Sequence, residues 1–569
     1  MNSQKIENQL NLALDTPSEV RAMTDNLDVG YMPAERAWEL IVRYEGSLDR
    51  VRALGVNVTE LINKYAVVIV PQNMIDTLAG LEEIIYIEKP KRLNFAIENG
   101  RRVSCIESVQ ETPFNLTGKG CILCVIDSGI DYSHEAFVGS DGRSRILEIW
   151  DQSIESRPDK VPEGYNIGSL YTKEDIDRAL LLPAIQRKDV VPSTDISGHG
   201  TAVASIAAGV ATEADIIVVK LGVLEENGFP RTTQLMEAID FCVKKGLEYG
   251  RPTSINISFG NNYGSHDGTS LLSTFIDSAT NVGRNVIVIG TGNEGSTATH
   301  TAGSVKENSK NNIELAVGRF EKNISIQLWK TYGDEFRITL TTPEGEEVLI
   351  DHNRRYSFSV DIGLNRLLIY VGMPAPYSLY QEVYIELIPL GEYIEDGLWN
   401  ITINSGRIIN GSYDLWLSGD RISNSTRFVR PVAETTLTIP STSSKAISVG
   451  AYDPLNFTYA DFSGRGFTRQ TNQIKPDIVA PGVNIMAAAP GGGTSMRTGT
   501  SFATPFVTGS AALMMEWGII NGNDMYLYGE KVKAYLIKGA KRFRGFEAWP
   551  NPQLGWGALC LKDSLPIEV

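Results

Sequence analysis

A serine at the start of a long apolar run is the strongest chemical signal in this chain of 569 residues. Gly499 and Thr500 lead into Ser501, and residues 502–515 form an apolar run that predicts a buried helix. Pro505 is compatible with that helix because first-turn N–H groups have no helical partner. A serine in this position presents its hydroxyl beside a free backbone N–H at the positive end of the helix dipole. Ser501 therefore suits a nucleophile that also binds the anion formed by its attack, whereas the alternative is that it only caps the helix.

Three more polar residues stand where predicted strands end or helices begin. Asp127 ends an apolar strand at 122–126, and Asn293 follows another strand at 286–289. His199 lies between two glycines at the start of a predicted helix, and the glycines permit close approach to its ring. In an open α/β sheet, sites assemble at the carboxyl ends of the strands. We expect these residues and Ser501 to meet there.

The elements that must position these residues form an α/β pattern over 99–305 and 438–569. Apolar strands alternate with amphipathic helices, which predicts a doubly wound parallel sheet. The strands are expected at 122–126, 216–219, 255–259, 286–289 and 446–450, and the helices at 233–249, 270–282 and 531–538, with an isolated strand at 146–151.

Residues 306–437 interrupt that pattern. Short alternating strands follow one another between turn residues, without amphipathic helices, at 324–328, 337–340, 366–370, 383–388, 398–403 and 412–417. This pattern of short strands and turns predicts an all-β sandwich inserted into the α/β domain.

Residues 1–98 predict a separate small α+β unit. Helical periodicity covers 33–44, a short helix is expected at 73–81, and strands are expected at 65–71 and 84–88. A basic break at 89–92 then leads into a polar, extended link that reaches about residue 102.

Composition excludes several classes of function. Apolar residues make up 42% and charged residues 21%, as is usual for a soluble globular protein. The net charge of −16 argues against binding nucleic acid or an anionic membrane. No apolar stretch reaches transmembrane length, and residues 1–20 carry no secretion signal, so synthesis in the cytoplasm is expected.

The cysteines are few and odd in number. Five of them are thinly spread, which fits a reducing interior rather than a disulfide scaffold. Cys121 and Cys124 form a Cys-x-x-Cys pattern inside an apolar strand. Residues three apart on a strand point to opposite faces, so we expect neither redox nor zinc chemistry from this pair.

Three motifs carry a family resemblance. Residues 127–131 (DSGID), 198–201 (GHGT) and 499–505 (GTSFATP) resemble the catalytic motifs of the subtilisin-like serine proteases, the subtilases or S8 family, in that family's Asp, His, Ser order. The similarity continues in 256–260 (NISFG), 292–295 (GNEG) and 475–482 (KPDIVAPG). It covers nearly all of the predicted α/β domain.

The resemblance implies a serine endopeptidase with a defined role for each residue. Ser501 attacks the scissile carbonyl, His199 accepts and returns the proton, and Asp127 holds the histidine tautomer. Asn293 and the Ser501 N–H donate to the oxyanion, and the loss of such a donor costs ~100–1,000-fold in rate. Phe506 stands where subtilisins often carry a second, structural histidine, so we expect no effect of this departure on the chemistry.

The same resemblance implies a cleft formed by edge strands. Leu221, Gly222, Ser258, Phe259 and Gly260 should pair with an extended protein substrate. No cofactor and no metal are expected, because the calcium loops of secreted subtilisins have no clear match. The other histidines, His134, His266, His300 and His352, are expected at the surface or in loops, although His266 lies near the cleft.

Within the subtilases, the chain looks most like the clostridial Csp spore-germination proteases. That likeness implies a spore-associated enzyme, a prodomain at 1–98 that remains in the cleft after self-cleavage, and a jelly-roll-like insert that confers rigidity. It implies activation of a cortex-hydrolase zymogen by limited proteolysis. We place the self-cleavage between Leu93 and Arg102. The alternatives are a general intracellular subtilisin and, in a different class, a pseudoprotease that binds a signal or partner.

Overall fold

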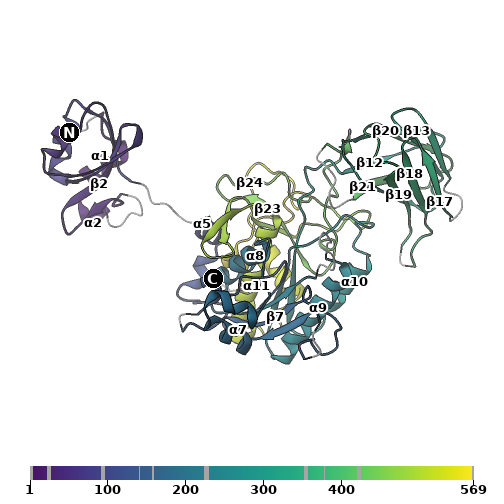
Figure 1. Cartoon of the computed structure of the whole chain (residues 1–569), viewed down its shortest axis with the longest axis horizontal. Coiled ribbons are helices and arrows are strands. Elements are labelled where there is room, and N and C mark those ends of the chain that lie inside the picture. The colour runs from purple at the N-terminus through teal and green to yellow at the C-terminus, as the bar shows by residue number, and fades with distance from the viewer. Residues whose placement is uncertain are drawn as a thin grey trace. The chain divides into compact units, whose positions relative to one another are not determined.

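The computed structural model describes residues 4–21, 27–90, 96–139, 141–156, 159–222, 230–351, 356–376, 378–418 and 425–566. The chain divides into two compact units, Met1–Phe95 and Ala96–Val569 (Figure 1). Each unit is described by itself.

The described part of the first unit contains a five-stranded antiparallel sheet in the order β1-β2-β4-β3, with β5 paired to β2. Its elements are α1 (Asn8–Asp15), α2 (Ser18–Arg21), β1 (Tyr31–Met32), β2 (Ala37–Tyr44), α3 (Asp49–Arg52), β3 (Asn57–Leu61), β4 (Tyr65–Pro71), α4 (Ile75–Ala79) and β5 (Ile84–Glu88). The helix expected at 33–44 is wrong, because this segment contains β2. Trp38, Leu40 and Val42 are all fully buried, and this spacing of two is that of a strand with one face in the core.

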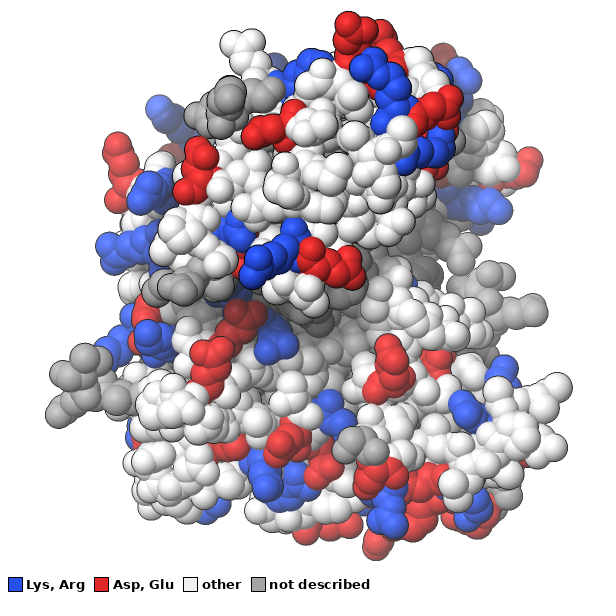
Figure 2. Space-filling view, turned by 90° about the vertical axis from the view of Figure 1, so that its left-hand side faces the viewer, with Lys and Arg blue, Asp and Glu red and all other residues white. Residues whose placement is uncertain are grey.

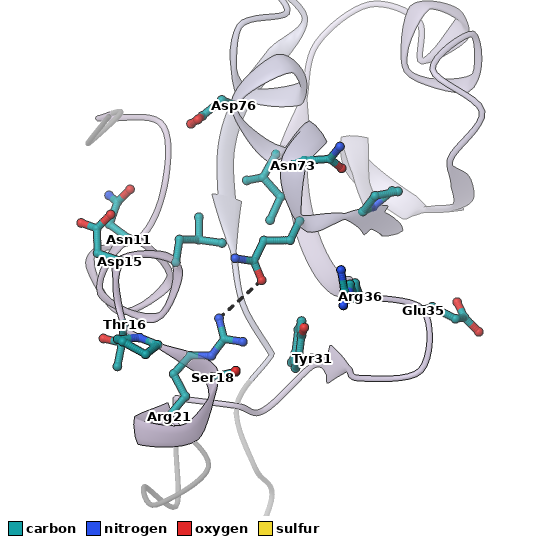
Figure 3. Close-up of a pocket in the computed structure, with 15 residues that line it drawn as sticks. Asn11, Asp15, Thr16, Ser18, Arg21, Tyr31, Glu35, Arg36, Asn73 and Asp76 are labelled. Atoms are coloured by element: carbon teal, nitrogen blue, oxygen red, sulfur yellow. Dashed lines mark hydrogen bonds between the residues drawn. The ribbon is translucent and has the colours of Figure 1, made fainter.

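Arg21 joins the helices of this unit to its sheet. Its side chain is 2% exposed, and it donates from Nη1 to the carbonyl of Ala13 over 2.9 Å and to Gln72 Oε1 over 3.5 Å. The guanidinium lies over the ring of Tyr31, 4.4 Å from its centroid. Figure 3 shows Arg21 beside a cavity of about 860 Å³, with the bond to Gln72 dashed. The buried cation is therefore held by hydrogen bonds and by an aromatic face.

The second unit is built on a nine-stranded sheet, counted over its described residues, in the order β24-β23-β11-β10-β6-β9-β7-β8 with β25 on β23. The neighbouring strands from β23 to β7 are parallel, and the edge strands β8 and β24 are antiparallel. The strands are β6 (Ile122–Asp127), β7 (Ile146–Asp151), β8 (Ser169–Thr172), β9 (Asp215–Lys220), β10 (Thr253–Ile257), β11 (Asn285–Gly290), β23 (Ile447–Asp453), β24 (Thr458–Tyr459) and β25 (Ile478–Pro481). The strand at 146–151, expected to be isolated, is an integral member of this sheet.

Helices cover both faces of the sheet, as expected for double winding (Figure 1). They are α5 (Ala96–Val103), α6 (Glu107–Gln110), α7 (Lys173–Leu180), α8 (His199–Val210), α9 (Thr232–Glu248), α10 (Leu271–Ala279), α11 (Thr500–Met515), α12 (Glu530–Lys538) and α13 (Leu561–Ser564). Cys121 packs in the core with α8 and α11, whereas Cys124 packs in the core with α9 and α10. The two cysteines therefore face opposite sides of the sheet, as the alternation of a strand requires.

The insert consists of two antiparallel sheets that share one apolar core. One has the order β12-β21-β14-β19-β18-β17 and the other β16-β15-β20-β13-β22. The strands are β12 (His300–Ser304), β13 (Lys310–Val317), β14 (Ile324–Thr331), β15 (Phe336–Thr341), β16 (Glu347–Asp351), β17 (Tyr356–Ile362), β18 (Asn365–Val371), β19 (Tyr380–Pro389), β20 (Gly397–Ser405), β21 (Ser412–Ser418) and β22 (Arg427–Phe428). The first strand begins at His300, ahead of the boundary expected at 306, and a jelly-roll topology stays a prediction.

The beginning of the second unit differs from expectation. Residues 96–103 form the helix α5, where an extended link was expected; residues 93–95 lie outside the described ranges. Gly100 lets this helix approach α11 closely, because a Cβ atom at this position would lie 2.4 Å from Cζ of Phe506. This close approach to α11 joins segments far apart in the chain, and the local sequence does not reveal it.

A disulfide joins this segment to the end of the chain. Cys105 is bonded to Cys560, 455 residues away in sequence, whereas Cys121, Cys124 and Cys242 are buried free thiols. The expectation of cysteines without disulfides is therefore wrong for one pair. Their pairing is set by the approach of α13 to the segment after α5.

Of the helices in the described ranges, none combines the length and apolarity that crossing a bilayer requires. On the side drawn in Figure 2, acidic and basic side chains are interspersed among uncharged ones. The small hairpin β26 (Ile485–Ala488) and β27 (Thr494–Arg497) completes the second unit just before α11.

Candidate active site

Asp127 and His199 form a hydrogen-bonded pair at the carboxyl edge of the sheet. Asp127 is the last residue of β6 and is fully buried, and its Oδ1 lies 2.7 Å from His199 Nδ1. His199 begins α8, after Gly198 in a left-handed conformation with φ of 70°. A Cβ atom on Gly200 would lie 2.2 Å from the Gly129 carbonyl, so only glycine permits this approach. The pairing fixes a proton on Nδ1 and leaves Nε2 as the acceptor.

Asp195 organises the turn that carries His199. Its carboxylate accepts from the Ser128 hydroxyl over 2.9 Å, from the Gly198 N–H over 3.0 Å and from the Thr201 N–H over 2.8 Å. These bonds tie the residue after Asp127 to the first turn of α8. The sequence reasoning missed Asp195, although a carboxylate just before a helix N-terminus is a recognisable signal.

The pKa of His199 is raised. Burial lowers it, but the charge of Asp127 and its hydrogen bond, together with the charge of Asp195, act in the opposite direction and prevail. Arg497 opposes them with a smaller lowering effect. The imidazole is therefore poised to hold the proton that it removes from a nucleophile.

Ser501 lies in the first turn of α11, as predicted. Its Oγ donates over a long 3.5 Å to the carbonyl of Ser258, and the Ser258 hydroxyl donates back to the Ser501 carbonyl over 3.2 Å. The ring of Phe502, the next residue, is 5.3 Å from the ring of His199. The start of α11 thus lies against the base, and Ser501 Oγ bonds to the Ser258 carbonyl rather than to Nε2. Catalytic hydrogen bonds often form only once substrate is bound.

Asn293 is held by the residue that precedes Ser501. Its Oδ1 accepts from the Thr500 N–H over 3.1 Å and from the Thr500 hydroxyl over 3.2 Å. Because a backbone N–H only donates, the amide oxygen must face Thr500, and this leaves Nδ2 as a donor beside Ser501. Together with the Ser501 N–H at the start of α11, it forms a pair of donors suited to an oxyanion.

A small pocket of about 190 Å³ opens next to these groups. It is lined by Ser258, Phe259, Gly260, Gly290, Gly292, Asn293, Glu294, Thr438, Thr500 and Ser501. Three of the five residues expected to bind substrate therefore lie on it. Thr438 follows the insert, and no signal in the sequence pointed to it.

Leu221 and Gly222 lie elsewhere, at the end of β9. Both are buried: the Leu221 N–H donates to the Asp127 carbonyl over 2.9 Å, and the Gly222 N–H donates to Gln152 Oε1 over 3.3 Å. They support the strand end that carries Asp127, and their role in substrate binding stays a prediction.

His134 and His266 lie in loops, one of the two places expected, and both are buried; His300 is buried within β12, so the expectation is wrong for that residue. His134, His266 and His300 are 5%, 1% and 1% exposed, and His352 lies outside the described residues. His266 and His300 both stack on Trp416, with ring centroids 4.2 and 4.6 Å apart. Burial lowers the pKa of His266 to about 4, so it stays neutral near neutral pH. The positions of His266 and His300 follow from packing between the insert and the α/β domain.

Both units of the chain are similar to known protein families. Residues 4–91 match the Csp protease B prodomain, and residues 118–360 and 421–557 match the subtilase family. The solved structure of the Clostridium perfringens CspB protease is 37% identical, with a TM-score of 0.76 over 82% of this chain and 96% of that chain.

Two curated proteins of Bacillus subtilis strain 168 are also similar. Minor extracellular protease Vpr is 23% identical over 79% of this chain and 52% of its own length. Serine protease AprX is 33% identical over 23% of this chain and 32% of its own length. The chain thus spans about half the length of Vpr and about a third of that of AprX.

Proposed function

This chain belongs to the subtilase family, and we propose that it is a serine endopeptidase that cleaves its own prodomain and then performs limited proteolysis. The observation that carries the proposal is the 2.7 Å bond between His199 and Asp127, with Ser501 at the start of α11 and the ring of the next residue, Phe502, 5.3 Å from the His199 ring. This arrangement has the parts of a catalytic triad.

In this proposal each step of the reaction has a residue that performs it. His199 Nε2 takes the proton of the Ser501 hydroxyl as it attacks the scissile carbonyl, and Asp127 stabilises the resulting imidazolium. The charge that develops on the carbonyl oxygen meets Nδ2 of Asn293 and the N–H of Ser501. His199 then returns the proton to the leaving amine, and water releases the acyl group by the same route.

The match to the Csp protease B prodomain supports the self-cleavage. In this proposal residues 1–98 are the prodomain, 99–305 and 438–569 form the catalytic domain, and 306–437 are a jelly-roll-like insert. The cut lies between Leu93 and Arg102. Since α5 begins at Ala96 and packs on α11, the cut falls before this helix or requires the helix to unwind.

The likeness to the Csp proteases supports a narrower role. We propose a protein substrate, the zymogen of a spore cortex hydrolase, which is activated by limited cleavage during germination. Synthesis in the cytoplasm, association with the spore and retention of the prodomain belong to the same proposal.

Intact-mass measurement of the purified wild type beside Ser501→Ala tests the activity. Two co-purifying fragments are expected in the wild type and one full-length species in the variant. Ser278→Ala is the matched control, because Ser278 is exposed on α10 and should leave cleavage intact. A single full-length species in the wild type that also resists labelling by a fluorophosphonate would favour the pseudoprotease. Extensive digestion of unfolded casein would favour a general intracellular subtilisin.

A further inference from the structure

Arg469 is a buried cation whose terminal N–H groups have no partner in the part of the chain that the structure describes. Its side chain is 2% exposed, and its Nε donates to Asp414 Oδ2 over 2.7 Å. The guanidinium lies over the ring of Tyr380, 4.6 Å from its centroid. Nη1 and Nη2 are buried and make no hydrogen bond with any described residue. Because arginine carries five N–H donors, most of its donor capacity is left unused, which is unfavourable for a buried group.

A cavity of about 380 Å³ lies beside this ion pair. It is bounded by β12 and β21 of the insert on one side and by residues 466–470 of the α/β domain on the other. Arg469 and Asp414 both line it, and apolar wall is added by Ala302, Phe467 and Pro552. A space of this size admits a small organic molecule, and a partly apolar wall with a few polar groups is typical of a ligand site.

Asp414 is engaged on both of its oxygens. Oδ2 accepts from Arg469 Nε, and Oδ1 lies 3.3 Å from Nε2 of His300. Burial acts to raise the pKa of Asp414, but the hydrogen bond from His300 and the charge of Arg469 outweigh it and lower the pKa. The carboxyl group is therefore ionised and bonds to Nε rather than to Nη1 or Nη2, which leaves those two groups to an acceptor from outside the chain.

The unused donors define the chemistry of the ligand. Nη1 and Nη2 present N–H groups in one plane, a geometry that matches the two oxygens of a carboxylate. Glu434, whose side chain is 53% exposed, also lines the cavity and disfavours a ligand with a second negative charge. We propose that this cavity binds a small organic acid whose carboxylate pairs with Arg469 and whose apolar part lies against Ala302 and Phe467.

The site lies at the junction between the insert and the loop after residue 260. The Arg469 N–H donates to the His266 carbonyl over 2.9 Å, and the His266 ring stacks on Trp416, which like Asp414 belongs to β21. A bound acid would therefore hold together residues from both sides of the junction and stabilise the folded chain. The inference does not depend on proteolysis, because this cavity shares no lining residue with the pocket at Ser501.

Binding is tested on the full chain with Ser501→Ala, so that self-cleavage does not change the sample. Acetate, butyrate and benzoate are titrated by isothermal calorimetry at constant ionic strength, each beside its neutral amide. We expect butyrate and benzoate to bind about tenfold or more tightly than their amides and to raise the melting temperature, because only the acids carry a carboxylate. Inorganic phosphate separates an organic acid from a simple anion, and it should bind more weakly than benzoate because it lacks an apolar part.

Two variants test the contact independently. Arg469→Lys keeps a positive charge beside Asp414 but removes the paired donors, and it should weaken benzoate binding by about tenfold or more. Ala302→Leu fills the cavity next to Asp414, its cross-strand neighbour, and should abolish binding with Arg469 unchanged. Ala316→Leu on β13, at a similarly half-buried position, is the matched control and should bind as before. Equal binding of acids and amides, tighter binding of phosphate than of benzoate, no binding of any acid, or binding that survives both variants would overturn the site.

Discussion

At the scale of single residues, the pKa of His199 is the property that matters most to the chemistry, and it is set by opposing effects. Burial works against a charged imidazole, and two carboxylates, Asp127 and Asp195, outweigh it. Asp127 is hydrogen-bonded to the ring, while Asp195 acts at longer range through its charge and also fastens the turn. The two acids thus contribute to the same proton transfer in different ways.

We predict that Asp195→Asn shifts the acid limb of kcat/KM to lower pH. Removing the charge removes one of the interactions that raise the pKa of His199, so the ring loses its proton at lower pH and becomes a base there. The measurement is a pH profile on one peptide substrate. Asp189→Asn, at an exposed position, is the control and should not move the limb. A shift to higher pH, or none, would show that Asp195 does not tune the histidine.

At the scale of elements, the insert holds the loop that forms one wall of the site. Gln327 on β14 accepts from the Gly264 N–H over 2.9 Å and donates to the Asn262 carbonyl over 3.3 Å. The ring of His266 stacks on Trp416 of β21, and its Nδ1 lies 2.8 Å from the Leu437 carbonyl. The loop after Ser258-Phe259-Gly260 is therefore fastened to two strands of the insert.

We predict that Gln327→Leu raises KM for a peptide substrate by about three- to tenfold, with a smaller effect on kcat, because misplacing a wall of the site weakens binding. Gln381→Leu is a matched control, since Gln381 is equally buried in the insert but bonds to the Gly372 carbonyl within it. Both variants should lose stability by about 1–3 kcal/mol, measured by denaturant unfolding. Equal KM values in the two variants would contradict the role of the insert in positioning the wall.

At the scale of the whole molecule, the start of the second unit is joined to the far end of the chain. The Cys105–Cys560 disulfide is reinforced by a hydrogen bond from the Leu561 N–H to the Ser104 carbonyl over 2.9 Å. In the proposed function, self-cleavage creates a new chain end close to α5. The disulfide and the packing of Gly100 on Phe506 keep that end attached to the catalytic unit.

We predict that Cys105→Ala, Cys560→Ala and the double variant all lose the same stability, about 2–4 kcal/mol, because each removes one cross-link that restrains the unfolded chain. Differential scanning calorimetry with thiol titration under denaturing conditions provides the measurement. The unreduced wild type should show three reactive thiols. Five thiols, or losses that add in the double variant, would exclude the bond.

The sequence alone predicted the proposed reacting groups and the frame that carries them. Asp127, His199 and Ser501 were found because each stands at a junction with a local signature: the end of an apolar strand, a glycine-flanked helix start, or a serine before a buried helix. The doubly wound sheet followed from the same short-range periodicities. The hydrophobic periodicity gave a wrong prediction where a segment fits both the helical and the strand period. In β2 it predicted a helix, although the alternate residues of this segment are buried as in a strand.

Only the tertiary structure decided which distant residues meet. Thr438 closes the pocket, Trp416 covers His266, Gly100 packs on Phe506 and Cys105 pairs with Cys560. Each contact joins segments that are far apart in the chain, and neither partner carries a periodic or capping signal that points to the other. The chemistry of the site is thus encoded locally, whereas the shape of its pocket, and with it the choice of substrate, is a property of the packed fold.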